Sequence, residues 1–176
     1  PLYELPLSTR GDVEVAIEHA RAAQRSWARL PIEHRARVIM RVHDLVLNRQ
    51  VQLLDLMQLE SGKTRLQAFE EIADIALVAR HYARAGATHL AAKHVWGAYP
   101  VLTRAETIRQ PHGVIGIVSP WNYPFTLPIG DSLPALLAGN AVVLRPDPQT
   151  TLTALFGAQI LADAGLLGYA ADRHPG

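Results

Sequence analysis

The sequence predicts an α/β protein in which an N-terminal helical layer is followed by part of a doubly wound parallel sheet. Two observations predict this class. Residues 12–85 repeat apolar side chains at helical spacing, and residues 111–164 alternate short apolar runs with helical segments. Two buried strands joined by a helical crossover, then another helix, form a right-handed βαβα unit, which is half of a Rossmann-like sheet.

The composition is that of a globular protein and excludes several classes. Of 176 residues, 49% are hydrophobic and 19% are charged, and the net charge is +1. No basic block suggests nucleic acid, and no apolar run approaches the roughly 20 residues of a membrane span. No signal peptide is visible, so we expect a cytoplasmic protein. Cysteine is absent, which removes disulfides, thiolate metal sites and cysteine nucleophiles.

Four helices are predicted in the first half. The first starts with Asp12 as N-cap, and Pro31 begins the second. The third covers about Gln50 to Glu60 and ends at Gly62, and the fourth runs from about Arg65 to Ala85. The buried stripe of the first helix is expected to contain Val13, Ala16, Ile17, Ala20, Ala23 and Trp27. The buried stripe of the fourth helix is expected to contain Phe69, Ile72, Ile75, Ala76, Ala79 and Tyr82.

This half carries no obvious chemical constellation. Six histidines, at 19, 34, 43, 81, 89 and 94, form no i, i+4 pair with a carboxylate ligand, so no metal site is expected. Glu70 and Glu71 are adjacent and therefore face different directions on a helix. We interpret them as a solvated helix face.

The second half predicts the sheet. Strands are expected at Ala105–Gln110, Val114–Val118 and Ala141–Leu144. A helix over Leu127–Leu137 must accommodate Pro128 and Pro134. An amphipathic helix over Thr151–Ala164 follows, with a stripe of Leu152, Leu155, Phe156, Ile160 and Leu161.

Ligands of such sheets bind beyond the carboxyl ends of the strands, which here are Ser119–Asn122 and Arg145–Asp147. Asn122 lies on a loop fixed by Pro120 and Pro124, and a rigid neutral donor there suits a carbonyl oxygen that becomes an oxyanion. The alternative is that Asn122 caps or turns the following segment. The sequence contains no G-x-G-x-x-G motif, so the conventional dinucleotide-binding fingerprint does not support a nucleotide site.

The stretch GVIGIVSPWNYP, followed by PALLAGNAVVLRPDPQT, resembles the aldehyde dehydrogenase superfamily. Weaker agreement extends upstream through Trp27, Arg35, Glu60-x-Gly62-Lys63 and His81-Tyr82-Ala83. The block from Ser119 to Gln149 is similar to bacterial succinate-semialdehyde dehydrogenases in particular.

The resemblance implies roles for seven residues. Asn122 matches an oxyanion-hole asparagine, and Ser119, Pro120 and Trp121 match a wall along which the cofactor lies. Arg145 stands where the family has a lysine that contacts the adenosine ribose or 2′-phosphate, and Asp147 and Pro148 follow it. A guanidinium can pair with a 2′-phosphate, and Pro148 replaces a position that is often Glu, so NADP is slightly favoured over NAD.

The family's chemistry needs a cysteine thiolate and a glutamate that lie downstream of these motifs, so the chain is expected to be inactive alone. Because it begins without Met and its tail offers no further strand, we expect a piece of something longer, with a truncation or shifted reading frame near Leu167. The resemblance divides the chain into three parts. Residues 1–103 are expected to form the helical part of the cofactor-binding domain, and residues 104–166 its βαβα half. Residues 167–176 are an atypical tail, and the catalytic domain is expected to be absent from this chain.

Two other interpretations stay open. One is a stand-alone nucleotide-binding or interaction module, and the other is a structural remnant that does not fold stably. For the full-length protein, the resemblance implies a small-molecule aldehyde substrate and a homo-oligomer.

Overall fold

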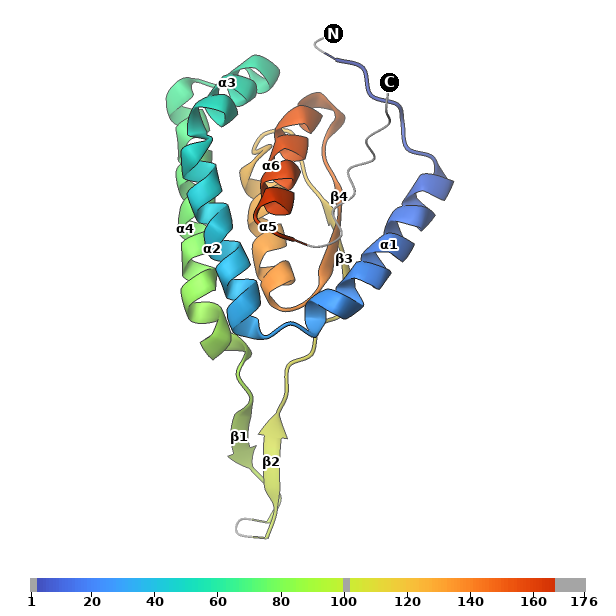
Figure 1. Ribbon diagram of the computed structural model, residues 1–176, viewed down its shortest axis with the longest axis vertical. Helices are drawn as coiled ribbons and strands as arrows, with labels where there is room; N and C mark the ends of the chain where they lie inside the picture. The colour runs from blue at the N-terminus through green and yellow to red at the C-terminus, as the bar shows by residue number, and fades with distance from the viewer. Residues whose placement is uncertain (1–2, 100–101, 167–176) are drawn as a thin grey trace.

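The computed structural model describes residues 3–99 and 102–166, which are arranged in layers (Figure 1). The outer layer consists of α2 (Ile32–Asn48), α3 (Gln50–Ser61) and α4 (Arg65–Leu90). Next to it lie α5 (Thr126–Leu137) and α6 (Thr151–Asp163), and then the strands β3 (Val114–Val118) and β4 (Ala141–Arg145). The helix α1 (Arg10–Ala28) packs on the other side of these strands. This α/β arrangement confirms the predicted class.

β3 and β4 are parallel and are connected through α5. Val114 lies opposite Ala141, and Val118 lies opposite Arg145. The predicted β-α-β unit is therefore confirmed, with β4 one residue longer than expected. The expectation that its two strands are buried is wrong, since every residue of β3 and β4 is half-buried or exposed. Because both strands run the same way, their carboxyl ends meet at one edge of the sheet.

A second, antiparallel pair extends from one end of the molecule (Figure 1). β1 (Lys93–Trp96) and β2 (Arg104–Thr107) pair with Lys93 opposite Thr107. The predicted strand over Ala105–Gln110 corresponds to β2 but ends too late, and β1 was not predicted. All four residues of β1 are exposed, so its sequence carries no alternation between buried and exposed positions.

One hydrophobic core joins the helical layer to the helices beside the sheet. Its fully buried members come from α2 to α6 and from the residue that precedes α5, and include Ile39, Leu53, Met57, Ile72, Ile75, Phe125, Ile129, Leu133 and Ile160. The helical layer is therefore part of the same folding unit as the β-α-β unit, and it sets where α5 and α6 lie.

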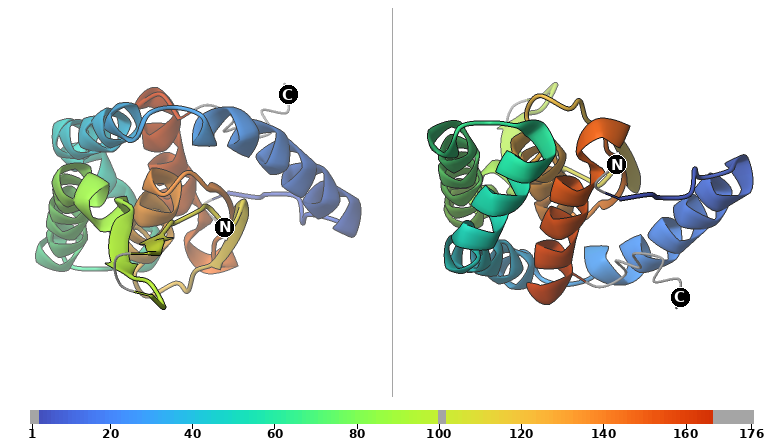
Figure 2. Two further views of the ribbon diagram at one scale, coloured as in Figure 1. Left: turned by 90° about the horizontal axis from the view of Figure 1, so that it is seen from below. Right: turned by 90° about the horizontal axis from the view of Figure 1, so that it is seen from above.

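Several expected helix details are wrong. Thr9, not Asp12, is the N-cap of α1; Asp12 is the third residue of a capping box with Thr9. Of the expected α1 stripe, only Ala20 and Trp27 are buried, because the first turns of α1 extend away from the body (Figure 2).

Two residues that were expected in the core are exposed: Phe69 is 44% exposed and Leu155 is 37% exposed. The buried face of α6 combines the expected Ile160 and Leu161 with the smaller residues Ala154, Gly157 and Ala158. α4 continues to Leu90 rather than ending near Ala85. Gly86 lies inside α4 against Leu137, where a Cβ atom would clash, so this glycine allows close packing instead of ending the helix.

The carboxyl end of α5 is held by the first two helices. The indole Nε1 of Trp27 donates to the Leu136 carbonyl at 2.7 Å, and Arg35 Nε donates to the Leu137 carbonyl at 2.8 Å. Gln24 Nε2 donates to the carbonyl of Gly139 at 3.0 Å. Arg35 is buried, and this desolvation lowers the pKa of its guanidinium.

No helix within residues 3–99 and 102–166 is both long and apolar enough to cross a membrane. The tail that the sequence assigns to residues 167–176 lies outside the described residues.

Candidate functional site

The two parallel strands bring the predicted site residues to one edge of the sheet. Val118 and Arg145 are register partners, and the Ser119 backbone N–H donates to the Arg145 carbonyl at 3.1 Å. The stretch from Ser119 to Asn122 therefore begins beside the stretch from Arg145 to Pro148.

The loop after β3 presents Asn122 to solvent between buried ends. Ser119 is buried at its start, and Pro124 and Phe125 are buried at its end, whereas residues 120–123 are exposed. Within the described residues, the Asn122 amide has no hydrogen-bond partner, and the residue at the N-cap position of α5 is Phe125. Asn122 therefore does not cap the next helix. Its amide is available to a ligand.

Glu71 holds the end of this loop from the helical layer. Its side chain is only 1% exposed, and Oε2 accepts hydrogen bonds from the backbone N–H groups of Phe125 and Thr126, both at 3.0 Å. The interpretation of Glu70 and Glu71 as a solvated face is wrong for Glu71. The signal was present, since Glu71 is three residues after Ala68 and four before Ile75, inside the apolar stripe of α4.

Lys63 completes the charge balance around Glu71. Its ammonium donates to Glu71 Oε1, and Nζ lies 4.4 Å from the centroid of the Tyr123 ring. Gly62 adopts a left-handed conformation with φ 70° and turns the chain from α3 toward α4, which brings Lys63 to this position.

The second strand end supplies an unpaired cation. Arg145 is exposed and has no ion-pair or hydrogen-bond partner for its side chain among residues 3–99 and 102–166. Asp147 is the N-cap of a short 3-10 helix, Pro148–Thr150, and its Oδ1 accepts from the Gln149 N–H at 2.9 Å. Pro148 is exposed.

Glu60 acts on α6 as Glu71 acts on α5. Its carboxylate accepts from the backbone N–H groups of Leu152 and Thr153 at 2.7 and 2.8 Å, and from Thr153 Oγ1 at 2.6 Å. The Tyr3 hydroxyl also donates to Glu60 at 2.6 Å. Burial, and then this bond, raise the pKa of Tyr3.

Carboxylates therefore occupy the amino ends of both helices that follow the parallel strands. In many dinucleotide-binding proteins such a helix end binds a phosphate. Here that position would repel one, so the groups left to receive an anion at this edge are side chains such as Arg145 and the Asn122 amide.

The comparisons with known proteins identify the family. The model of the aldehyde dehydrogenase family matches residues 1–167. The chain belongs to the aldehyde dehydrogenase family.

Curated relatives agree with this. The chain is 48% identical over 166 residues to a Mycobacterium ulcerans protein named putative succinate-semialdehyde dehydrogenase (NADP+) 2, and 48% identical over 165 residues to a Mycolicibacterium smegmatis protein of the same type. In both cases the match covers 94% of this chain and 32% of the relative. The chain thus spans about a third of the length of these relatives.

Solved structures show the same fold. An NAD-dependent benzaldehyde dehydrogenase from Corynebacterium glutamicum superposes with a TM-score of 0.83 at 31% identity, over 90% of this chain and 34% of that one. An NADP-dependent enzyme from E. coli gives a TM-score of 0.83 at 32% identity, over 89% of this chain and 32% of that one.

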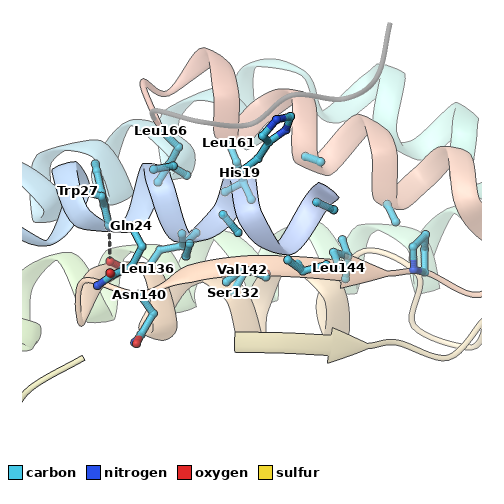
Figure 3. A pocket seen from close by; sticks show the side chains of 18 of the residues that line it. His19, Gln24, Trp27, Ser132, Leu136, Asn140, Val142, Leu144, Leu161 and Leu166 are labelled. Carbon is cyan, nitrogen blue, oxygen red and sulfur yellow. Dashed lines mark hydrogen bonds between the residues drawn. The ribbon is translucent and has the colours of Figure 1, made fainter. Parts of the chain in front are cut away.

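This aldehyde dehydrogenase chain also contains an apolar groove of about 260 Å³ between α1, β4 and α6 (Figure 3). Four consecutive residues of β4, from Ala141 to Leu144, line it, although their side chains alternate between the two faces. The groove therefore follows the edge of β4 away from β3. It includes none of the seven predicted site residues.

The described part of the chain contains no group of three histidine or carboxylate residues placed to hold a metal ion. What the sequence analysis missed were the anchors: Glu71 entirely, and Glu60 and Lys63 except as part of a weak motif. The anchoring role of these residues could be recognised only in part from the sequence, because each one contacts a segment that lies far away along the chain.

Proposed function

We propose that this chain forms part of an NAD(P)-dependent aldehyde dehydrogenase that oxidises an aldehyde to a carboxylic acid. In this proposal, residues 1–103 and 104–166 are two parts of one cofactor-binding domain. The observation that carries it is the shared strand edge, where the Asn122 amide and the Arg145 guanidinium follow hydrogen-bonded strand ends and have no partner in the part of the chain that the structure describes.

Asn122 is assigned the role of hydrogen-bond donor to the oxyanion that forms from the aldehyde oxygen. Its loop is anchored at both ends, so its N–H groups need not reorganise when negative charge develops on the aldehyde oxygen. Loss of one such donor typically lowers turnover by about 10²–10³-fold.

The cofactor is assigned to Ser119, Pro120, Trp121, Arg145, Asp147 and Pro148. When bound, the nicotinamide would supply the acceptor for the hydride that leaves the substrate. Arg145 favours NADP, because a guanidinium binds a phosphate through paired hydrogen bonds. The relatives whose names specify NADP, and the structurally similar NAD-dependent benzaldehyde dehydrogenase, both support a nicotinamide cofactor.

Succinate semialdehyde is the proposed substrate, on the strength of relatives of that name at 48% identity. A homo-oligomer is proposed for the longer protein. Because the 176 residues contain no cysteine, we expect no aldehyde turnover by this chain alone.

Thermal shift with NADP and with NAD tests the cofactor assignment. At a ligand concentration 100 times the dissociation constant, binding adds about 2.7 kcal/mol of stability. Arg145→Gln should weaken NADP about 10- to 100-fold and NAD far less, because it removes a charged hydrogen-bond donor from the 2′-phosphate.

Equal loss for both nucleotides would contradict the role of Arg145, and no stabilisation by either would contradict the cofactor site. Stabilisation by nucleotide without any cofactor reduction in the presence of succinate semialdehyde is also what the stand-alone binding module predicts. A longer protein that reduces NADP with this aldehyde would decide between the two functions.

A further inference from the structure

We propose that Glu71 and Lys63 are positioning residues that hold the loop from Ser119 to Phe125, and thereby Asn122, in a fixed geometry. The inference deepens the proposed function and rests on it for what Asn122 binds. The holding of the loop stands on the contacts alone.

The loop is fastened at its two ends and is exposed between them. The Ser119 N–H is bound to the Arg145 carbonyl, and Phe125 is 0% exposed in the core. Between these points, residues 120–123 are exposed, so their geometry depends on how firmly the ends are held.

Glu71 is suited to fix the second end. Phe125 and Thr126 are the N-cap and the first residue of α5, and α5 has no side-chain cap of its own. The Phe125 N–H is buried and the Thr126 N–H is partly buried, so both would be costly to leave without an acceptor, and one oxygen of the Glu71 carboxylate accepts both. Asn122 lies only three residues before Phe125.

Lys63 extends this anchor into the loop itself. Its ammonium neutralises the other oxygen of Glu71 and lies over the ring of Tyr123, the residue directly after Asn122. One buried carboxylate and one cation thus connect the start of α5 to the neighbour of Asn122.

The test compares four variants of the chain: Glu71→Ala, Glu71→Gln, Lys63→Met and, as a matched control, Trp27→Phe. Trp27→Phe removes a hydrogen bond from the opposite end of the same helix, at the Leu136 carbonyl, and keeps an aromatic ring in the core. The readouts, without ligand, are the side-chain amide resonance of Asn122 and the backbone amide exchange of Phe125 and Thr126 by NMR.

Glu71→Ala should accelerate exchange at Phe125 and Thr126 by about 10- to 100-fold and shift the Asn122 resonance. Glu71→Gln keeps an acceptor oxygen and should retain most of the protection, and Lys63→Met should shift Asn122 and Tyr123. Trp27→Phe should lower thermal stability without moving the Asn122 resonance.

The proposal is overturned if Lys63→Met and both Glu71 variants leave Asn122 unmoved, or if Trp27→Phe moves it equally. If Glu71→Ala does not fold, Lys63→Met decides, because Glu71→Gln keeps an acceptor and is expected to hold the loop in place. NADP thermal shift of the unmodified chain separates the two proposals, because failure to bind NADP contradicts the cofactor site and leaves the loop measurement valid.

Discussion

At the scale of single residues, the unusual feature is that two buried or half-buried glutamates serve backbone rather than substrate. Glu71 and Glu60 each bind two consecutive N–H groups at the start of a helix. Negative charge at a helix amino end is favourable, and bonds to N–H groups compensate for burial. Both carboxylates are thereby explained as structural anchors, and among residues 3–99 and 102–166 the side chains of Asn122 and Arg145 have no hydrogen-bond or ion-pair partner.

Asn122 gives a prediction at this scale. Because its amide has no partner among the described residues, Asn122→Ala should change the free energy of unfolding by no more than about 0.5 kcal/mol in urea denaturation. Asn140→Ala is the contrasting variant, since Asn140 is buried, accepts from the Gly113 N–H and donates to the Ala135 carbonyl. A loss of stability in Asn122→Ala as large as in Asn140→Ala would show a structural role for Asn122.

At the scale of elements, the four N-terminal helices α1 to α4 fix both ends of α5 and α6. Carboxylates hold the amino ends, and Trp27, Arg35 and Gln24 hold the carboxyl end of α5. Arg41 Nε donates to the Ala164 carbonyl at 2.7 Å beyond α6. Arg49 pairs with Asp163 at 2.6 Å, which offsets an acidic residue in the last turn of α6. The charges therefore match the dipoles of both helices.

Close contact between α5 and α6 makes Gly157 sensitive to substitution. A Cβ atom at Gly157 would lie 2.6 Å from Ile129 Cδ1 and 3.1 Å from Phe125 Cε2, and both side chains are fully buried. Gly157→Ala should therefore destabilise the chain by about 1–3 kcal/mol. Gly11→Ala, in the exposed first turn of α1, should stabilise it by up to about 1 kcal/mol. Urea unfolding measures both, and a stabilising Gly157→Ala would contradict the packing argument.

Tyr3 ties the segment before α1 to Glu60 of α3 and accepts a hydrogen bond from the Thr151 N–H of α6, which predicts a pH dependence. Because burial and the bond to Glu60 raise the pKa of Tyr3 above 10.0, the neutral hydroxyl is favoured in the fold. Its stabilisation is complete below the unfolded pKa and is lost as pH rises through the folded pKa.

Tyr3→Phe should therefore lower stability by about 1 kcal/mol at neutral pH, and this difference from the unmodified chain should shrink as the pH rises above about 10 through the raised pKa of the folded state. Thermal unfolding across this range measures the difference. Parallel pH profiles for the two proteins would show that the Tyr3 hydroxyl does not contribute.

At the scale of the whole molecule, one core supports two very different sheets. In the β3–β4 pair, which packs against α1 and α5, seven of the ten residues are half-buried and three are exposed, whereas seven of the eight residues of the β1–β2 pair are exposed. Isolated two-stranded hairpins are marginally stable in water.

Native-state hydrogen exchange should therefore be fastest in residues 93–96 and 104–107 and slowest in α2, α4 and α5, whose residues form most of the core. Exchange measured by mass spectrometry tests this order. If the backbone amides of the β1–β2 hairpin were protected from exchange as strongly as those of α4 in a dilute solution of the protein, another surface would have to cover the hairpin.

The sequence by itself determined most of the elements, but not β1, and the edge of the sheet at which the candidate site lies. Helical periodicity, the left-handed turn at Gly62 and the apolar runs of β3 and β4 depend on neighbours along the chain, so local patterns reveal them. The rule that parallel strands share a carboxyl edge then places Ser119 beside Arg145.

Only the tertiary structure decided what holds that edge in place. Glu71 binds residues 54 and 55 positions away, and Glu60 binds residues 92 and 93 positions away. A glutamate on a helix looks the same in the sequence whether it meets water or the amino end of another helix. The difference arises from the packing of α3 and α4 against α6 and α5, which no local pattern contains.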